Sequence, residues 1–198
     1  MELEEFLKKT GLKKLHDYQL EFMKDRSRFI LIRSSRQMGK TLCLILKCLF
    51  NGVNNPDSLS LIFTATARMK ILLEERIEYF KKKIGVDIRY KVLTPKWDSI
   101  LPYSPQFVYV DEAEFLRDED ISNIMLFAVS AEQVVVTFTP LKKMAKKLIE
   151  MCRNERISQH YWPFYLNPKL KQYAEYFKTI VDEEHFRYEF LAEIPVLG

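Results

Sequence analysis

A polar stretch between two apolar runs has the composition of a loop that binds phosphate groups. It reads Ser34-Ser35-Arg36-Gln37-Met38-Gly39-Lys40-Thr41, between apolar runs at 29–32 and 42–50. A loop between a strand and a helix directs several backbone N–H groups at one point, where the helix dipole adds positive charge. In such a loop Gly39 allows close approach of the backbone, Lys40 reaches the β and γ phosphates, and Thr41 offers its hydroxyl to Mg²⁺. The stretch predicts a site for a nucleoside triphosphate, although serine stands at 34 where the usual pattern has glycine.

Two adjacent carboxylates, Asp111 and Glu112, follow directly after the apolar run 107–110. A carboxylate at the carboxyl end of a parallel strand lies in the crevice where α/β sheets bind ligands. Asp111 is therefore predicted to hold Mg²⁺ through its water shell, and Glu112 to take a proton from the attacking water. The alternative is a solvated turn at the end of a strand. The acids that follow are interpreted as a solvated face: Glu114, Asp118, Glu119 and Asp120.

A second group of hydroxyls ends another apolar run, at Thr137-Phe138-Thr139-Pro140. A hydroxyl at this edge of the sheet is placed to sense the γ-phosphate. A β-branched strand that simply stops at a proline explains the same pattern, so both interpretations of Thr137 and Thr139 stay open.

Strands that alternate with helices are needed to bring these groups together, and the apolar pattern predicts them. Strands are expected at 29–32, 59–63, 107–110 and 134–136, with an edge strand at 86–92 and a further one at 157–161. Helices are expected at 2–25, 42–50, 68–83, 121–129 and 141–151, and again up to 193, with a turn at 51–57. This alternation predicts an α/β fold with a mostly parallel central sheet covered by helices on both faces.

Length and composition predict one domain in a reducing compartment. The 198 residues suit one domain, with a soft boundary near 140 between a core (1–140) and an extension (141–198). With 47% hydrophobic and 29% charged residues the chain is not a disordered one. Three cysteines without CxxC spacing, no signal-peptide core and no apolar run of about 20 residues predict a cytoplasmic protein without a membrane segment. The net charge of +4 permits contact with nucleic acid without requiring it.

Together these motifs resemble the ATPase domain of the large terminase subunit, the motor that packages DNA into viral capsids. The loop 35–41 is similar to that family's "SRQ-hydrophobic-GK[ST]" form, and Asp111-Glu112 to its second nucleotide motif with a catalytic glutamate. Tyr18-Gln19 resembles the adenine-side glutamine motif, and 137–140 the motif that couples hydrolysis to movement. The segment 186–193, FRYEFLAE, resembles the end of the ATPase domain.

The resemblance implies a P-loop NTPase fold of the RecA/ASCE-like class, with ATP and Mg²⁺ as cofactors. Its nucleotide-binding residues would be Gln19 and the loop residues Ser34, Ser35, Gln37, Met38, Gly39, Lys40 and Thr41. Arg36 would be an arginine finger in cis or a sensor of the γ-phosphate; the alternative is that it hydrogen-bonds to neighbouring loop carbonyls. Gln19 would read the adenine edge, against the alternative of a helix-surface amide.

The function implied is ATP hydrolysis that moves double-stranded DNA, in the cytoplasm of a host cell if the chain is viral. Portal or capsid proteins and a homo-oligomeric ring are the other expected partners. The chain ends at Gly198, where a terminase nuclease domain would begin, so DNA cutting is not expected. The alternative function is a stand-alone nucleotide-gated DNA-binding or helicase-like ATPase. A basic face at Lys142, Lys143, Lys146 and Lys147 is interpreted either as a contact for DNA phosphates or as a solvated helix face.

Overall fold

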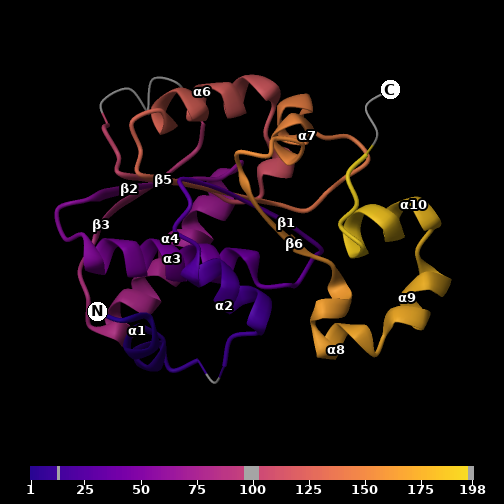
Figure 1. Cartoon of the computed structure of the whole chain (residues 1–198), viewed down its shortest axis with the longest axis horizontal. Helices are drawn as coiled ribbons and strands as arrows, with labels where there is room; N and C mark the ends of the chain where they lie inside the picture. Colours follow the sequence, from indigo (N-terminus) through magenta and orange to yellow (C-terminus); the bar gives the residue numbers. More distant parts are fainter. Residues whose placement is uncertain (13, 96–102, 196–198) are drawn as a thin grey trace.

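The computed structural model describes residues 1–12, 14–95 and 103–195, and these form one parallel sheet between two layers of helices (Figure 1). The strand order is β3-β2-β4-β5-β1-β6, and every neighbouring pair is parallel. The strands are β1 (Phe29–Ser34), β2 (Leu59–Phe63), β3 (Arg89–Leu93), β4 (Phe107–Val110), β5 (Gln133–Phe138) and β6 (Ser158–Trp162). The predicted fold class is confirmed, and β3 is an edge strand as expected.

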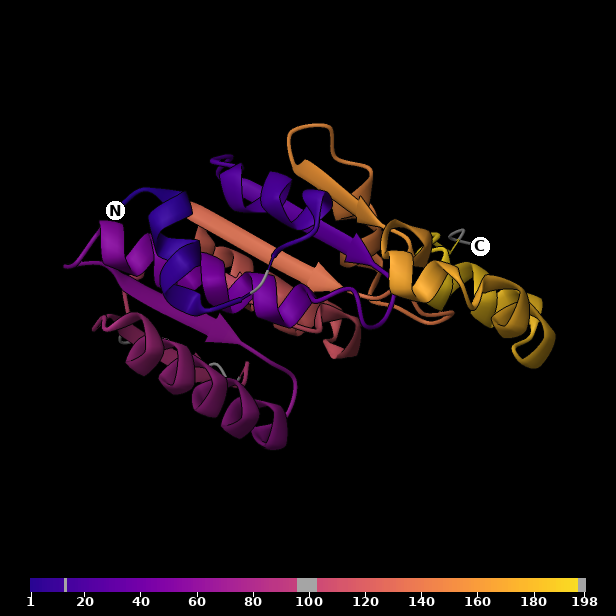
Figure 2. The ribbon, with the colours of Figure 1, turned by 90° about the horizontal axis from the view of Figure 1, so that it is seen from below.

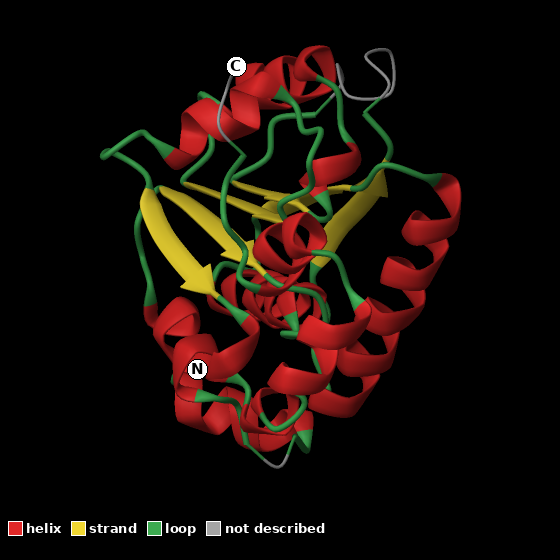
Figure 3. Ribbon diagram, turned by 90° about the vertical axis from the view of Figure 1, so that its right-hand side faces the viewer, coloured by secondary structure: helices red, strands yellow, loops and turns green. Residues whose placement is uncertain are grey.

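Helices from both halves of the chain cover the two faces of the sheet. One face carries α1 (Leu3–Thr10), α2 (Asp17–Lys24), α3 (Lys40–Asn54) and α4 (Ala67–Ile84), and the other carries α6 (Asp118–Ala128) and α7 (Lys146–Cys152) (Figures 1 and 3). The remaining pieces are short: η1 (Ala113–Phe115), η2 (Phe164–Leu166), α8 (Pro168–Lys171), α9 (Ala174–Ile180), α10 (Glu183–His185) and the π-helical η3 (Phe186–Phe190). Figure 2 shows α8, α9 and α10 beyond the carboxyl ends of the strands.

The strands are buried on both faces because successive side chains point to opposite sides of the sheet. In β1, Ile30 and Ile32 join the core under α1 to α4, whereas Leu31 joins the core under α6 and α7. Strands covered on both sides carry continuous apolar runs instead of alternating ones. This is why their positions could be predicted from the sequence.

The N-terminal region predicted to be helical over 2–25 forms two separate helices, α1 and α2. Gly11 ends α1 with φ 65°, and its N–H bonds to the carbonyl of Lys8. Glycine adopts this left-handed conformation without a steric penalty, which makes it a common helix terminator. The second helix, α2, begins only at Asp17.

The basic helix predicted over 141–151 begins later and ends later, at Lys146–Cys152. The side chain of Asp118, at the start of α6, accepts the backbone N–H of Lys147 at 2.7 Å and so satisfies one donor of the first turn of α7. Lys142 and Lys143 precede the helix, so the four lysines do not share one helix face. Lys142 instead donates to Glu184 at 2.7 Å.

The helical spacing of 68–83 predicts that Ile71, Leu72, Ile77 and Phe80 face inward, and the prediction is wrong for the first two. Ile71 and Leu72 are 56% and 47% exposed, whereas Ile77 and Phe80 are buried as expected. Only the C-terminal part of the predicted apolar face of α4 reaches the core.

Gly52 lies inside α3, which continues through Asn54 instead of turning at 51. A Cβ at Gly52 would meet Cγ2 of Ile88 at 2.7 Å and Cβ of Ile88 at 2.9 Å, so glycine is required by packing. Helix propensity alone favours alanine here by about 1 kcal/mol. Overpacking of a buried site costs about 1–3 kcal/mol. We therefore expect Gly52→Ala to destabilise the fold by up to about 2 kcal/mol in urea unfolding.

Ile88→Ala removes the Cγ2 atom that an alanine at 52 would meet. In a double-mutant cycle, Gly52→Ala should therefore lower the free energy of unfolding less in the Ile88→Ala background than in the wild type. A Gly52→Ala variant more stable than the wild type would show that Ile88 yields freely and that propensity dominates.

Candidate active site

The predicted phosphate loop connects β1 to α3 at the carboxyl edge of the sheet. Gln37 (φ 62°) and Gly39 (φ 84°) are left-handed, so the loop turns twice before Lys40 begins the helix. Neighbouring elements hold it from both sides. Ser35 N–H donates to the carbonyl of Trp162 on β6 at 2.9 Å, and the carbonyl of Met38 accepts hydrogen bonds from α2. The loop leads directly into α3, which has 15 residues. Because the first N–H groups of a helix have no partner within it, those of α3 point toward this loop.

Lys40 is buried at the centre of the site. Its ammonium donates to the carbonyl of Ser35 at 3.2 Å and to the hydroxyl of Thr139 at 2.7 Å. Burial lowers the pKa of Lys40, and the carboxylates of Glu114, Asp111 and Glu112 oppose that change. One lysine thus joins the loop after β1 to the end of β5.

Asp111, which directly follows β4, joins the start of α3 to β5. Its two carboxylate oxygens accept the hydroxyl of Thr41 at 2.8 Å and the hydroxyl of Thr137 at 2.7 Å. The strand order explains the meeting, because β5 lies between β1 and β4 and all three end at the same edge. A buried carboxylate beside a hydroxyl is a set of hard oxygen donors that suits Mg²⁺. The spatial pairing expected from the sequence is therefore present.

Glu112 has a strained backbone and a carboxylate oxygen without a hydrogen-bond partner. Its φ of 54° is left-handed, which costs a non-glycine residue about 1–2 kcal/mol. Its Oε2 atom is buried without a hydrogen-bond partner. Burial raises the pKa of Glu112, as does the neighbouring Asp111, whereas Lys40 and Arg36 oppose the shift. A carboxylate held in this way is free to accept a proton from a water molecule.

The acidic run after Glu112 is not the uniformly solvated face that was predicted. Glu114 is only 7% exposed, and burial raises its pKa to about 7. The cause is local: the left-handed Glu112 leads into the short helix η1, which turns Glu114 inward. Asp120 is also buried and caps α6 through Arg117, at 3.1 Å to the backbone N–H and 3.0 Å to Nε. Glu119 is exposed as expected.

Arg36 contacts the C-terminal segment instead of the phosphate loop itself. Its Nε pairs with the carboxylate of Glu189 on η3, and its backbone N–H donates to the carbonyl of the same residue at 3.3 Å. Glu189 lies in the FRYEFLAE segment, but nothing in the local pattern indicated that it meets Arg36. The finger or sensor role of Arg36 stays a prediction.

Gln19 is buried against the phosphate loop, so it is not a helix-surface amide. Its Nε2 donates to the carbonyl of Met38 at 3.0 Å, and its Oε1 accepts the N–H of His16 at 2.9 Å. Adenine recognition by Gln19 stays a prediction, and it requires these two bonds to be exchanged for bonds to the base. A pocket of about 520 Å³ lies beside α2, lined in part by His16 and Tyr18.

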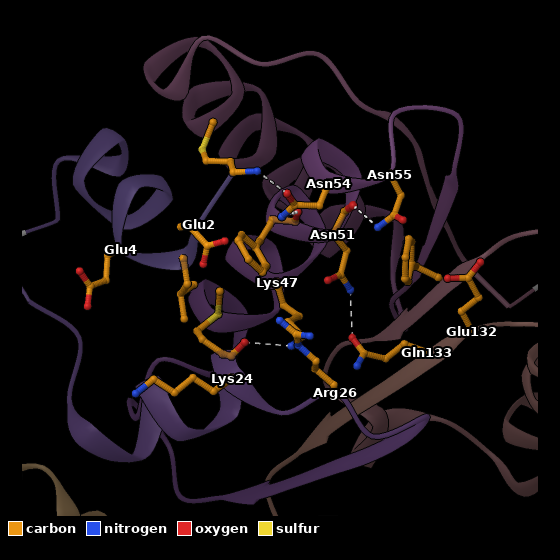
Figure 4. A pocket seen from close by; sticks show the side chains of 15 residues that line it. Glu2, Glu4, Lys24, Arg26, Lys47, Asn51, Asn54, Asn55, Glu132 and Gln133 are labelled. Carbon is orange, nitrogen blue, oxygen red and sulfur yellow. Dashed lines mark hydrogen bonds between the residues drawn. The ribbon is translucent and has the colours of Figure 1, made fainter.

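A pocket of about 750 Å³ at the opposite edge of the sheet contains none of the predicted nucleotide residues (Figure 4). Lys47 lines it, but its ammonium donates to the carbonyls of Met23 at 3.0 Å and Asp25 at 2.6 Å. Asn51 similarly donates to Gln133 at 2.9 Å. These polar groups are used to join α3 to the starts of the strands, so the carboxyl edge remains the candidate active site.

No protein-family model matches this sequence, and no curated protein matches it. Solved structures do match. The large terminase ATPase domain of Thermus phage P74-26 has a TM-score of 0.83 at 14% identity, over 96% of this chain and 98% of that one. A large terminase from another thermophilic bacteriophage has a TM-score of 0.77 at 10% identity, over 93% of this chain and 54% of that one.

A helicase shares the fold less closely. The UvsW helicase of bacteriophage T4 has a TM-score of 0.60 at 12% identity, over 82% of this chain and 68% of that one. The second of the two terminases has also been solved with ADP and with ATP-gamma-S. At these identities the likeness establishes the fold: this chain has the fold of large terminase ATPase domains, which confirms the expected P-loop NTPase class.

Proposed function

We propose that this chain is an ATPase that uses ATP and Mg²⁺ to move double-stranded DNA, as the packaging ATPase of a virus or virus-like element. The observation that carries the proposal is the bond of 2.8 Å between Thr41 and Asp111. It joins the phosphate loop to the acidic strand end, which is the pairing that a nucleotide with its metal ion requires. The shared fold with terminase ATPase domains, one of which has been solved with ADP and with ATP-gamma-S, supports the same interpretation.

The proposed roles follow from the position of each group. The N–H groups of the loop and the start of α3 receive the phosphates, and Lys40 exchanges its bonds to Ser35 and Thr139 for phosphate oxygens. Thr41, and Asp111 through a water shell, would hold Mg²⁺, whose charge would neutralise that of the phosphates. Glu112 orients a water molecule for in-line attack and takes its proton.

Arg36 and the two threonines are proposed to carry the signal of the bound nucleotide. Arg36 reaches the γ-phosphate on leaving Glu189, and it then stabilises charge in the transition state or senses the phosphate. Thr137 donates a hydrogen bond to Asp111, and Thr139 accepts one from Lys40. A movement of Asp111 or Lys40 on nucleotide binding would therefore be transmitted to β5. These contacts favour a sensing role for the threonines over a simple end of the strand.

The single-domain organisation, 1–198, is part of the proposal, with a core (1–140) and an extension (141–198). The extension supplies β6, which pairs with β1, and η3, which contacts Arg36. Double-stranded DNA, a homo-oligomeric ring, and portal or capsid proteins are the proposed partners. Among the described residues no helix has an apolar stretch long enough to cross a bilayer.

Steady-state ATP hydrolysis, titrated with double-stranded DNA, tests this function. We expect Mg²⁺-dependent hydrolysis that rises with duplex DNA, and Lys40→Ala serves as the blank. A translocation assay, in which duplex movement displaces a third strand, then separates a motor from an ATPase that only binds DNA. Absence of hydrolysis with and without DNA would overturn the proposal.

The alternative function is a nucleotide-gated DNA-binding or helicase-like ATPase. The observation that favours it is the fold shared with the UvsW helicase. Slow hydrolysis without displacement of the third strand would identify a nucleotide-gated binder. Stimulation by single-stranded DNA in preference to duplex DNA would identify a helicase-like enzyme.

A further inference from the structure

Glu114 is a buried carboxylate for which the proposed reaction has no role. It lies on η1, two residues beyond the proposed base, and its Oε2 atom is buried without a hydrogen-bond partner. An unpaired anion in the protein interior is destabilising unless another charge compensates it. Its neighbours should therefore explain why it is there.

The compensating charge is Lys40. Burial lowers the pKa of Lys40, and the charge of Glu114 opposes that change although the two side chains form no direct ion pair. Helix η1, which carries Glu114, packs against β5. The backbone N–H of Thr139 also faces the Glu114 carboxyl group, while the hydroxyl of the same threonine accepts a hydrogen bond from the Lys40 ammonium at 2.7 Å. Glu114, Lys40 and Thr139 thus form one network, which joins the ends of β4 and β5 to the start of α3.

We infer that Glu114 is a positioning residue: its carboxylate is the counter-charge that keeps Lys40 folded back on Thr139 before nucleotide binds, and a triphosphate must take Lys40 from it. The inference rests on the proposed function only in that the loop binds a triphosphate. Two anions then compete for one lysine. Binding of the nucleotide separates Lys40 from Glu114, and the free energy of that separation weakens the affinity for nucleotide.

Glu114→Gln removes the competing charge and keeps the size and the hydrogen-bond acceptor. We expect its equilibrium Kd for a fluorescent ATP analogue with Mg²⁺ to be about tenfold lower than that of the wild type, because the attraction of Lys40 to a buried anion no longer opposes phosphate binding. The measurement is made at about pH 8, where a carboxyl group with a pKa of about 7 is mostly ionised. Glu114→Asp keeps the charge and should bind with nearly the wild-type Kd.

Glu119→Gln is the matched control, because Glu119 is an exposed glutamate five positions along the chain. Its Kd should equal that of the wild type. Thermal unfolding of each variant checks the fold. If Glu114→Gln does not fold, Glu114→Met, of similar volume and without charge, carries the same expectation.

The outcomes separate this inference from the proposed function. If Glu114 only anchors the Thr139 backbone, glutamine substitutes for it and the Kd is unchanged; an unchanged or higher Kd overturns the inference alone. If the wild type itself fails to bind the analogue, the proposed function fails with it.

Discussion

Glu112→Gln should leave nucleotide binding intact and reduce ATP hydrolysis by about 10²–10⁴-fold, the usual contribution of a positioned general base. Glutamine has the same shape but cannot take a proton from water. The wild-type carboxylate is suited to that step because its Oε2 atom has no internal partner and its strained backbone holds it beside Asp111. The measurement is a comparison of kcat with the Kd of a fluorescent ATP analogue.

Glu119→Gln is again the matched control, because it makes the same chemical change on the surface of α6 and should retain wild-type kcat. Near-normal turnover in Glu112→Gln would remove Glu112 from the proposed mechanism. Loss of binding together with turnover would instead indicate that Glu112 supports the structure of the loop.

Lys40→Ala should abolish turnover, with a loss of at least about 10²–10³-fold, because it removes a cation directed at the charge that develops on the phosphates. It should also weaken nucleotide binding, and that distinguishes it from Glu112→Gln. The buried position of Lys40 makes the effect large, since charges interact more strongly where water is excluded.

A fold defect has to be separated from a binding defect in Lys40→Ala. The variant loses the bonds to Ser35 and Thr139, and it leaves Glu114 without its counter-charge. The double variant Lys40→Ala with Glu114→Gln relieves that buried anion and should unfold at a higher temperature than Lys40→Ala, while remaining inactive. Recovery of turnover in the double variant would contradict the role of Lys40.

Several features of this protein were predictable because they are local. A strand buried on both faces requires a continuous apolar run, so β1, β2, β4 and β5 could be located from the sequence. A loop that cradles phosphate requires glycine, lysine and a hydroxyl in a set order, so the stretch 34–41 could be predicted as such a loop, and it does connect β1 to α3. The ends of helices were harder to predict. Gly52 is typical of a turn locally, yet it lies inside α3, where Ile88 packs against it.

Side chains in the acidic run 111–120 could not be sorted by residue type. Glu114 and Glu119 are the same amino acid five positions apart, and one is buried whereas the other is exposed. The difference arises from a single left-handed residue, Glu112, and from the end of β5 that η1 packs against. Neither feature is encoded by the pattern of charges.

The sequence by itself determined the α/β class, the position of the predicted phosphate loop between β1 and α3, and the acidic pair at the end of β4. Each depends on neighbouring residues and on the convergence of parallel strands at one edge. Only the tertiary structure decided which groups meet there. The strand order brings Asp111 to both Thr41 and Thr137, whose hydroxyls it accepts, and Arg36 pairs with Glu189 from 153 positions away. Contacts over such separations depend on how the layers pack around the sheet, and local preferences of the chain do not specify that packing.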